Sequence, residues 1–142
     1  MSTSARPVPA PDEASAPYWE AAAAHRLVLA RCQACSQFSH PPSTVCGQCH
    51  STEPNWSWDP VDGAGKVRSW TVMRSSFLPG LGEDVPFVLV DVELDVQQEL
   101  RLIGRLLDGP DATIEPGSRV VLGFEDLAPG VAVPAFKLED AR

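Results

Sequence analysis

Long apolar stretches are missing from this chain of 142 residues. No apolar run approaches the ~18 residues that a membrane-spanning helix needs. The beginning of the chain, MSTSARPVPAPDEASAP, also lacks the unbroken apolar segment of a secretory signal. The sequence therefore predicts a cytoplasmic protein without a membrane contact. With 44% apolar and 21% charged residues, the composition is that of one or two small globular domains.

Acidic residues are absent between positions 21 and 52, where Arg26, Arg31 and all three histidines lie. Residues 1–52 have no net charge, so residues 53–142 carry the whole net charge of −8 (8 basic minus 16 acidic residues). The acid-free stretch could face an anion or an acidic partner. It could equally be a small structural module that happens to lack carboxylates.

The usual enzyme signatures are missing too. The chain has no G-x-S-x-G, no P-loop and no H-E-x-x-H motif, and the G-x-G that begins at Gly80 lacks the rest of a dinucleotide fingerprint. The sequence contains no self-contained catalytic constellation. We therefore expect no catalytic residue in this chain, and an enzyme that acts alone is the less favoured interpretation.

The four cysteines form the strongest motif, C-x2-C-x10-C-x2-C, with Cys32, Cys35, Cys46 and Cys49 as its members. Two C-x-x-C knuckles allow four thiolates to surround one Zn²⁺ tetrahedrally, and ten intervening residues suffice for a short hairpin. Four sulfur ligands leave no open position for water. The motif thus predicts one structural zinc per chain, which would fold a module that has little apolar core of its own.

Three other interpretations of the cysteines remain open. Cys46 to His50 matches the C-x-x-C-H pattern of haem attachment, but haem would leave the first knuckle unexplained. A redox dithiol would need only one C-x-x-C and a βαβ surrounding that is absent. Iron of the rubredoxin type uses similar knuckles, and the spacing does not separate it from zinc.

The chain divides into a proline-rich leader over residues 1–14, which we expect to be mobile, a helix with a ribbon over residues 15–53, and a second domain over residues 54–142. Ser15 can cap a helix with Pro17 in its first turn, ending near His25. Its two large aromatic residues, Tyr18 and Trp19, must dock on the chain's own core or on another subunit. A short strand at residues 27–29 leads into the cysteines.

Five apolar or alternating runs follow in the second domain, at residues 65–77, 86–96, 99–107, 119–124 and 131–138. Short strands without helical segments between them predict a small β-barrel or sandwich. Even-numbered residues from Val88 to Val96 should face the core, with acidic residues outside. A three-residue turn at 97–99 would place Asp95 opposite Arg101 and Asp91 opposite Arg105 as ion pairs.

Several features occur in one order: Tyr18-Trp19-Glu20, the strand leading into Cys32, Pro41-Pro42, Cys46 and Cys49, the glycines around Gly65, and Pro134-Ala135-Phe136. Over residues 17–138 this order resembles the small acyl-CoA-associated proteins that combine a rubredoxin-like zinc ribbon with an OB-fold. The resemblance implies a mainly β fold: an N-terminal helix, the zinc ribbon, then a five-stranded OB-fold barrel. One departure is Ser36, where many such ribbons have glycine after the first knuckle, which makes that turn less certain.

The resemblance also implies a function. Members resemble non-catalytic subunits of thiolases, acyltransferases and lipid-transfer-type aldolases that shorten steroid side chains, with the partner supplying the catalytic residue. We expect a hetero-oligomer with acyl-CoA at the shared site. Lys66, Arg68 and Arg74 are the candidate cations for the CoA phosphates, because Arg101 and Arg105 should be paired. The alternative is nucleic-acid binding, which the acidic second domain disfavours.

Overall fold

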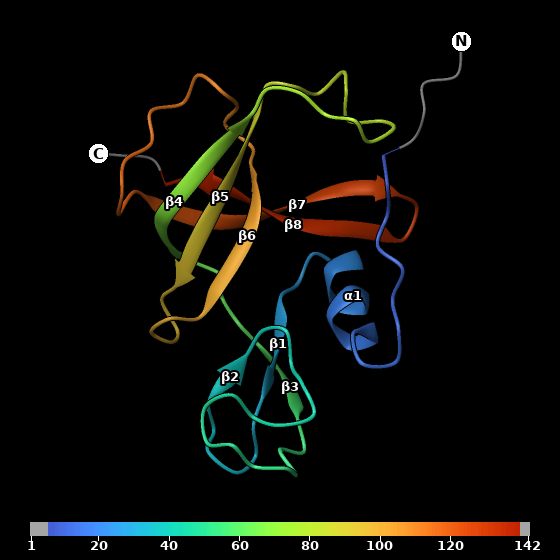
Figure 1. Cartoon of the computed structure of the whole chain (residues 1–142), viewed down its shortest axis with the longest axis vertical. Helices are drawn as coiled ribbons and strands as arrows, with labels where there is room; N and C mark the ends of the chain where they lie inside the picture. The colour runs from blue at the N-terminus through green and yellow to red at the C-terminus, as the bar shows by residue number, and fades with distance from the viewer. Residues whose placement is uncertain (1–5, 140–142) are drawn as a thin grey trace.

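The computed structural model describes residues 6–139 as a helix and two β units (Figure 1). The helix α1 (Ala16–Ala23) precedes a three-stranded ribbon sheet of β1 (Val28–Arg31), β2 (Phe38–Ser39) and β3 (Ser57–Pro60). The strands β4 (Gly65–Met73), β5 (Phe87–Leu94), β6 (Arg101–Leu106), β7 (Arg119–Ala128) and β8 (Val131–Leu138) form a closed barrel. The mainly β architecture predicted from the sequence is confirmed.

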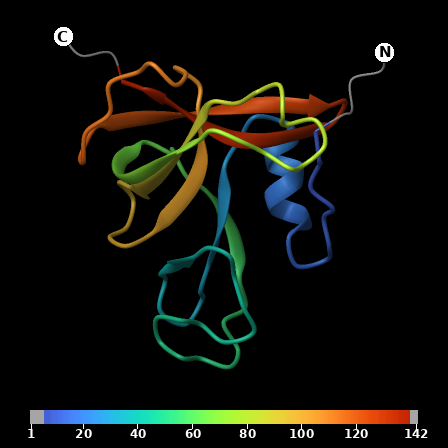
Figure 2. The ribbon, with the colours of Figure 1, turned by 45° about the horizontal axis from the view of Figure 1, so that its top comes forward.

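The barrel has the strand order β4-β5-β6-β8-β7, which closes through the pairing of β4 with β7. All neighbouring pairs are antiparallel except β6 and β8, which run parallel. A five-stranded Greek-key barrel with this order is an OB-fold. The ribbon extends away from the barrel, with α1 beside it (Figures 1 and 2).

The barrel core follows the predicted alternation along β5. Val88, Val90, Val92 and Leu94 are all at most 2% exposed and pack with Phe136 of β8. The pattern ends there, because Val96 lies beyond the end of β5 and is 51% exposed. The hydrophobic effect of these side chains holds the barrel closed.

The predicted pairing of β5 with β6 was wrong by two residues. Asp91 is opposite Ile103, and Glu93 is opposite Arg101. The connection is longer than the expected three-residue turn, since the Leu94 amide donates to the carbonyl of Leu100 and Glu99 adopts a left-handed φ of 65°. A shift of two residues keeps every side chain on its face but changes its partners.

Because of this shift, the ion pairs on the outer face of β5 and β6 differ from the predicted ones. Arg101 binds Asp91 diagonally at 3.0 Å, whereas Arg105 binds Asp84 at 3.1 Å, outside β5. Asp95 pairs with Arg119 of β7. Both arginines that the sequence analysis assigned to ion pairs are therefore paired, but with other carboxylates than expected.

The helix α1 starts after Ser15 as predicted and has proline in its first turn, but it ends at Ala23, before His25. His25 adopts a left-handed φ of 57°, and its Nε2 lies 2.7 Å from an oxygen of Asp126. The ring of His25 also stacks on Phe124 at 5.1 Å. The long β7–β8 hairpin thereby reaches beyond the barrel to α1, as Figure 2 shows.

One side chain of the barrel forms two hydrogen bonds with the backbone of the ribbon. Gln97, in the β5–β6 connection, accepts a hydrogen bond from the Phe38 amide at 2.8 Å and donates one to the Phe38 carbonyl at 3.0 Å. The sequence analysis missed β2, which has only two residues, and β3, which lacks alternation. Among residues 6–139, no helix has the length and apolarity needed to cross a membrane.

Candidate functional site: a four-cysteine centre and an aromatic groove

The two cysteine knuckles have the same local geometry. The amide of Ser36 donates to the carbonyl of Cys32 at 2.8 Å, and the amide of His50 donates to that of Cys46 at 2.9 Å. Both donors lie in the left-handed region, with φ of 65° for Ser36 and 63° for His50. Glycine adopts this conformation most easily, which explains why the serine at position 36 made the turn uncertain from sequence. Here the serine adopts the turn nevertheless.

The four predicted ligands come together at the tip of the ribbon. All four sulfur atoms lie within 4.8 Å of one another, with Cys32 to Cys49 at 3.9 Å and Cys35 to Cys46 at 3.8 Å. A tetrahedron with Zn–S bonds of about 2.3 Å has sulfur atoms ~3.8 Å apart. The donor set therefore fits a tetrahedral metal ion, and both knuckles contribute to one cluster.

The thiols of this cluster differ in acidity. Backbone amides of Cys49 and Gln48 point at the sulfur of Cys46 and lower its pKa to about 6. The Gln37 amide favours the thiolate of Cys35, but burial and the neighbouring sulfurs raise its pKa to about 11. Four thiolates so close together repel one another, so a cation is required for all of them to ionise.

The expected acyl-CoA cations lie on and just after β4. Lys66 Nζ is 3.3 Å from Glu93, and Arg68 binds Glu99 at 3.0 Å, which raises the pKa of Arg68. Arg68 is the extra residue of a β-bulge opposite β5. Arg74 is exposed just after β4 and has no ion-pair partner within residues 6–139. Two of the three cations thus already have carboxylate partners.

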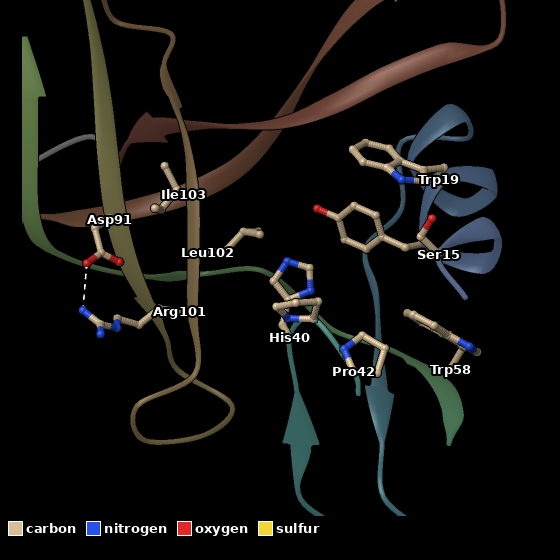
Figure 3. Close-up of a pocket in the computed structure, with 11 residues that line it drawn as sticks. Ser15, Trp19, His40, Pro42, Trp58, Asp91, Arg101, Leu102 and Ile103 are labelled. Carbon is tan, nitrogen blue, oxygen red and sulfur yellow. Dashed lines mark hydrogen bonds and ion pairs between the residues drawn. The ribbon is translucent and has the colours of Figure 1, made fainter. Parts of the chain in front are cut away.

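A hollow of about 630 Å³ lies where α1, the ribbon and the barrel meet (Figure 3). Ile103 and Leu102 of β6 form one side, and Trp19 of α1 forms the other. His40 lies between them, on the ribbon. Burial lowers the pKa of His40, and its Nδ1 is buried without a hydrogen-bond partner. The imidazole is therefore neutral at physiological pH.

Tyr18 forms part of the same hollow. It is 8% exposed and packs into the core, with its ring edge-on to Trp19 at 4.8 Å and 5.1 Å from the ring of His40. Burial raises the pKa of Tyr18 to about 12, so the phenol is neutral. Of the two aromatic residues predicted to dock, Tyr18 thus docks on the chain's own core, while Trp19 stays partly exposed.

A second hollow of about 730 Å³ continues along the ribbon and shares Pro42 and Trp58 with the first. Trp56 contributes to it, and its indole nitrogen donates to the Ser43 carbonyl at 2.9 Å. Sequence analysis missed this surface, because Trp56 and Trp58 follow the cysteine motif without a recognisable pattern. Their proximity to Pro42 results from the pairing of β1 with β3.

Comparisons with known proteins give a consistent result. Residues 19–55 match a family model described as the ChsH2 rubredoxin-like zinc ribbon domain, and residues 58–125 match the ChsH2 C-terminal OB-fold domain. A solved chain described as "Ltp2-ChsH2(DUF35) aldolase" is 33% identical, with a TM-score of 0.77 over 92% of this chain and 98% of that chain.

A curated relative, the "Probable enoyl-CoA hydratase alpha subunit" of Thermomonospora curvata, is 33% identical over 132 residues. The match covers 93% of this chain but only 40% of the relative. The ribbon match ends and the barrel match begins close to β3, and the barrel match ends within β7. Since sequence, family models and fold agree, the chain belongs to the ChsH2 family of zinc-ribbon and OB-fold proteins.

Proposed function

We propose that this chain is a non-catalytic cytoplasmic subunit that docks on a thiolase-like or lipid-transfer-type aldolase partner and helps to shape that partner's acyl-CoA site. The observation that carries the proposal is the likeness to a chain described with an Ltp2-ChsH2 aldolase, which extends over 98% of that chain at 33% identity. A chain that is similar from end to end offers its partner the same kind of surfaces.

The chemistry of the chain agrees with a supporting role. Its four cysteines form a closed sulfur cluster, which leaves none of them as a free nucleophile. The two neutral rings of the first hollow, Tyr18 and His40, contact each other at a tilt of 32° and form no nucleophile–base pair with a third group in the described part of the chain. The reacting groups would therefore come from the partner.

We propose further that the cysteines hold one zinc ion per chain. The family model describes a zinc ribbon, and the sulfur separations of 3.8 and 3.9 Å suit zinc. Zinc held by four thiolates supplies cross-linking and no catalysis. Its role here would be to fix the two cysteine knuckles, and with them the part of the ribbon that lines the two hollows.

We propose, on the basis of the family resemblance, that acyl-CoA binds at the site shared with the partner. Its acyl groups would include the steroid side chains of lipid metabolism. Among the three candidate cations, Arg74 is the best placed to bind a phosphate, because Lys66 and Arg68 already face Glu93. The charge-neutral variant Arg74→Gln should weaken CoA binding by the complex, whereas Lys66→Gln should change it less.

The test is co-expression with a thiolase-like or aldolase-like protein encoded beside this chain. We expect a soluble complex that cleaves or transfers an acyl-CoA, with no such activity in this chain alone. Trp19→Ala should weaken assembly. A partner that is soluble and fully active by itself, or an isolated chain that turns over acyl-CoA, would refute the proposal.

A further inference from the structure

The two adjoining hollows form one surface, which we call the Trp–Pro groove. It runs from Ile103 on the barrel, past Trp19 and Trp58, to Trp56 on the ribbon, with Pro42 in its middle. Three of the four tryptophans in the chain line this groove, and none of the three is fully buried. Partly exposed tryptophans concentrated in one groove are typical of the energetic centre of a protein interface.

The walls of the groove are held in place by the rest of the fold. Gln97 ties the ribbon to the barrel through two hydrogen bonds with Phe38. The hydrogen bond of 2.7 Å between His25 and Asp126 ties the segment after α1 to the β7–β8 hairpin. A groove whose three walls are fixed to one another needs little rearrangement when something binds, which favours affinity.

Ile103 is the clearest example of apolar surface that the groove leaves exposed to water. It lies on the outer face of β6, where arginines occupy the positions two residues before and after it, and 65% of it is exposed. An exposed apolar residue between charged neighbours on an acidic barrel has no folding role that the structure shows. Covering it together with the tryptophans would remove a contiguous apolar surface from water.

The charges around the groove restrict what can cover it. Glu13 and Glu53 line the ribbon end, and neither has an ion-pair partner within residues 6–139. At the barrel end, Asp91 has one oxygen buried without a hydrogen-bond partner. The only basic side chain in the lining, Arg101, is bound to the other oxygen of Asp91, and His40 is neutral.

The excess of negative charge in the lining of the groove favours a positively charged occupant. The phosphates of CoA would meet two unpaired carboxylates, Glu13 and Glu53, and no unpaired cation, and a flat anionic membrane would suit neither the concave shape nor a chain of net charge −8. An apolar peptide segment with basic residues would pack its apolar side chains against the tryptophans and pair its cations with the carboxylates. We propose that the Trp–Pro groove holds a segment of the partner protein that carries apolar side chains next to lysine or arginine.

The proposal rests on the proposed function only for the identity of that partner. Its first test compares two exposed β-branched strand residues. Ile103→Lys places a lysine in the groove, opposite Asp91, and the control Val121→Glu places a glutamate on β7, opposite Lys137. Each new charge faces an opposite charge across the sheet, but the lysine also lies between Arg101 and Arg105, so the urea midpoint of both chains is compared with that of the wild type first.

Binding of each purified chain to the co-encoded thiolase-like or aldolase-like protein is then measured by calorimetry at two salt concentrations. We expect Ile103→Lys to lose about tenfold or more in affinity, and Val121→Glu to keep the wild-type value. Glu53→Lys should weaken binding and reduce its salt dependence, because it removes an attraction. A complex that forms equally well with Ile103→Lys overturns the groove proposal and leaves the proposed function standing.

A second test does not need that partner. A random peptide library displayed on phage is selected on the full-length wild-type chain, with the Ile103→Lys chain used to remove other binders. We expect peptides that combine aromatic or aliphatic residues with lysine or arginine. If such peptides appear but the co-encoded protein does not bind, the proposed function fails and the groove proposal holds.

Two results of the second test would overturn the groove proposal. One is a selection that yields no peptide dependent on Ile103. The other is quenching of the tryptophan fluorescence by CoA, or by vesicles of phosphatidylglycerol and phosphatidylcholine, that Ile103→Glu abolishes. The groove would then be a site for a phosphate-bearing ligand.

Discussion

Replacing Cys32 by serine should weaken metal binding and loosen the tip of the ribbon, while the barrel stays folded. Cys32 is fully buried, and its amide and carbonyl both form hydrogen bonds within the first knuckle. Between the two knuckles, Phe38 is the only large apolar side chain that is buried, since Val45 is 40% exposed. A segment with so little apolar burial depends on its metal for its fold.

The expected size of the effect follows from the number of ligands. Binding of a structural zinc contributes about 10–16 kcal/mol at neutral pH. Shared equally among four thiolates, one ligand contributes ~2.5–4 kcal/mol, so Cys32→Ser should weaken metal binding about 100- to 1,000-fold. The barrel has its own core around Phe136 and the valines of β5, so it should keep its stability.

Hydrogen exchange can locate the loosened region. In Cys32→Ser, the amides of Ser36, Cys46 and His50 should lose protection, because their acceptors lie within the knuckles and the adjoining loop. The amide of Val67, bonded to Ser118 in the barrel, should keep its protection. The control Ala34→Ser changes an exposed residue of the same knuckle and should bind one zinc per chain. An unchanged zinc affinity of Cys32→Ser in competition with a chelator, or a wild-type chain that is folded without metal, would refute the reasoning.

Four further predictions concern stability and binding. Gly65→Ala would place a Cβ 2.3 Å from the Glu93 carbonyl oxygen, so urea unfolding should show a loss of about 1–3 kcal/mol, whereas Gly82→Ala, with no atom within 4 Å, should be neutral. Ser36→Gly should stabilise the zinc-loaded chain by about 0.5–1 kcal/mol in the same assay, because glycine removes the cost of the left-handed φ of 65°; a destabilised variant would contradict this. Burial lowers the pKa of His40 below its ordinary value of 6.5, so protons favour the unfolded chain and stability should fall as the pH drops below about 6.5. At saturating zinc, a drop from about pH 7 to about pH 5.5 should lower the urea concentration at the unfolding midpoint less for His40→Gln than for the wild type. Equal decreases would refute the assignment of this pH dependence to His40. The isolated chain, with a net charge of −8, should not bind a single-stranded oligonucleotide in fluorescence anisotropy at physiological salt, and submicromolar, salt-sensitive binding would restore the nucleic-acid alternative.

The sequence alone determined the features that depend on neighbouring residues. The spacing of the cysteines was sufficient to predict one four-sulfur cluster, because each C-x-x-C knuckle is a local turn and a short loop joins the two. The alternation in β5 was sufficient to identify its buried face, because the side chains of a strand alternate regardless of their partners. The regular strands of the barrel followed from the same patterns.

Only the tertiary structure decided how distant segments meet. The register of β5 with β6 depended on the left-handed residue Glu99, which no pattern signals, and that register paired Arg101 with Asp91. Lys66 and Arg68 looked free in sequence, yet β5 brings Glu93 to both of them. Charge pairing across a sheet is set by register, and register is set by the geometry of the connection.

The Trp–Pro groove shows the same distinction most clearly. The stretch from residue 21 to 52 has no acidic residue, which suggested a surface without repulsive carboxylates. The fold nevertheless brings Glu13 and Glu53, which flank that stretch, together along the ribbon end of the groove. Composition reports only which charges a segment contains. Their surroundings are created when helix, ribbon and barrel pack together, because packing places side chains by distance in space and not by distance along the chain.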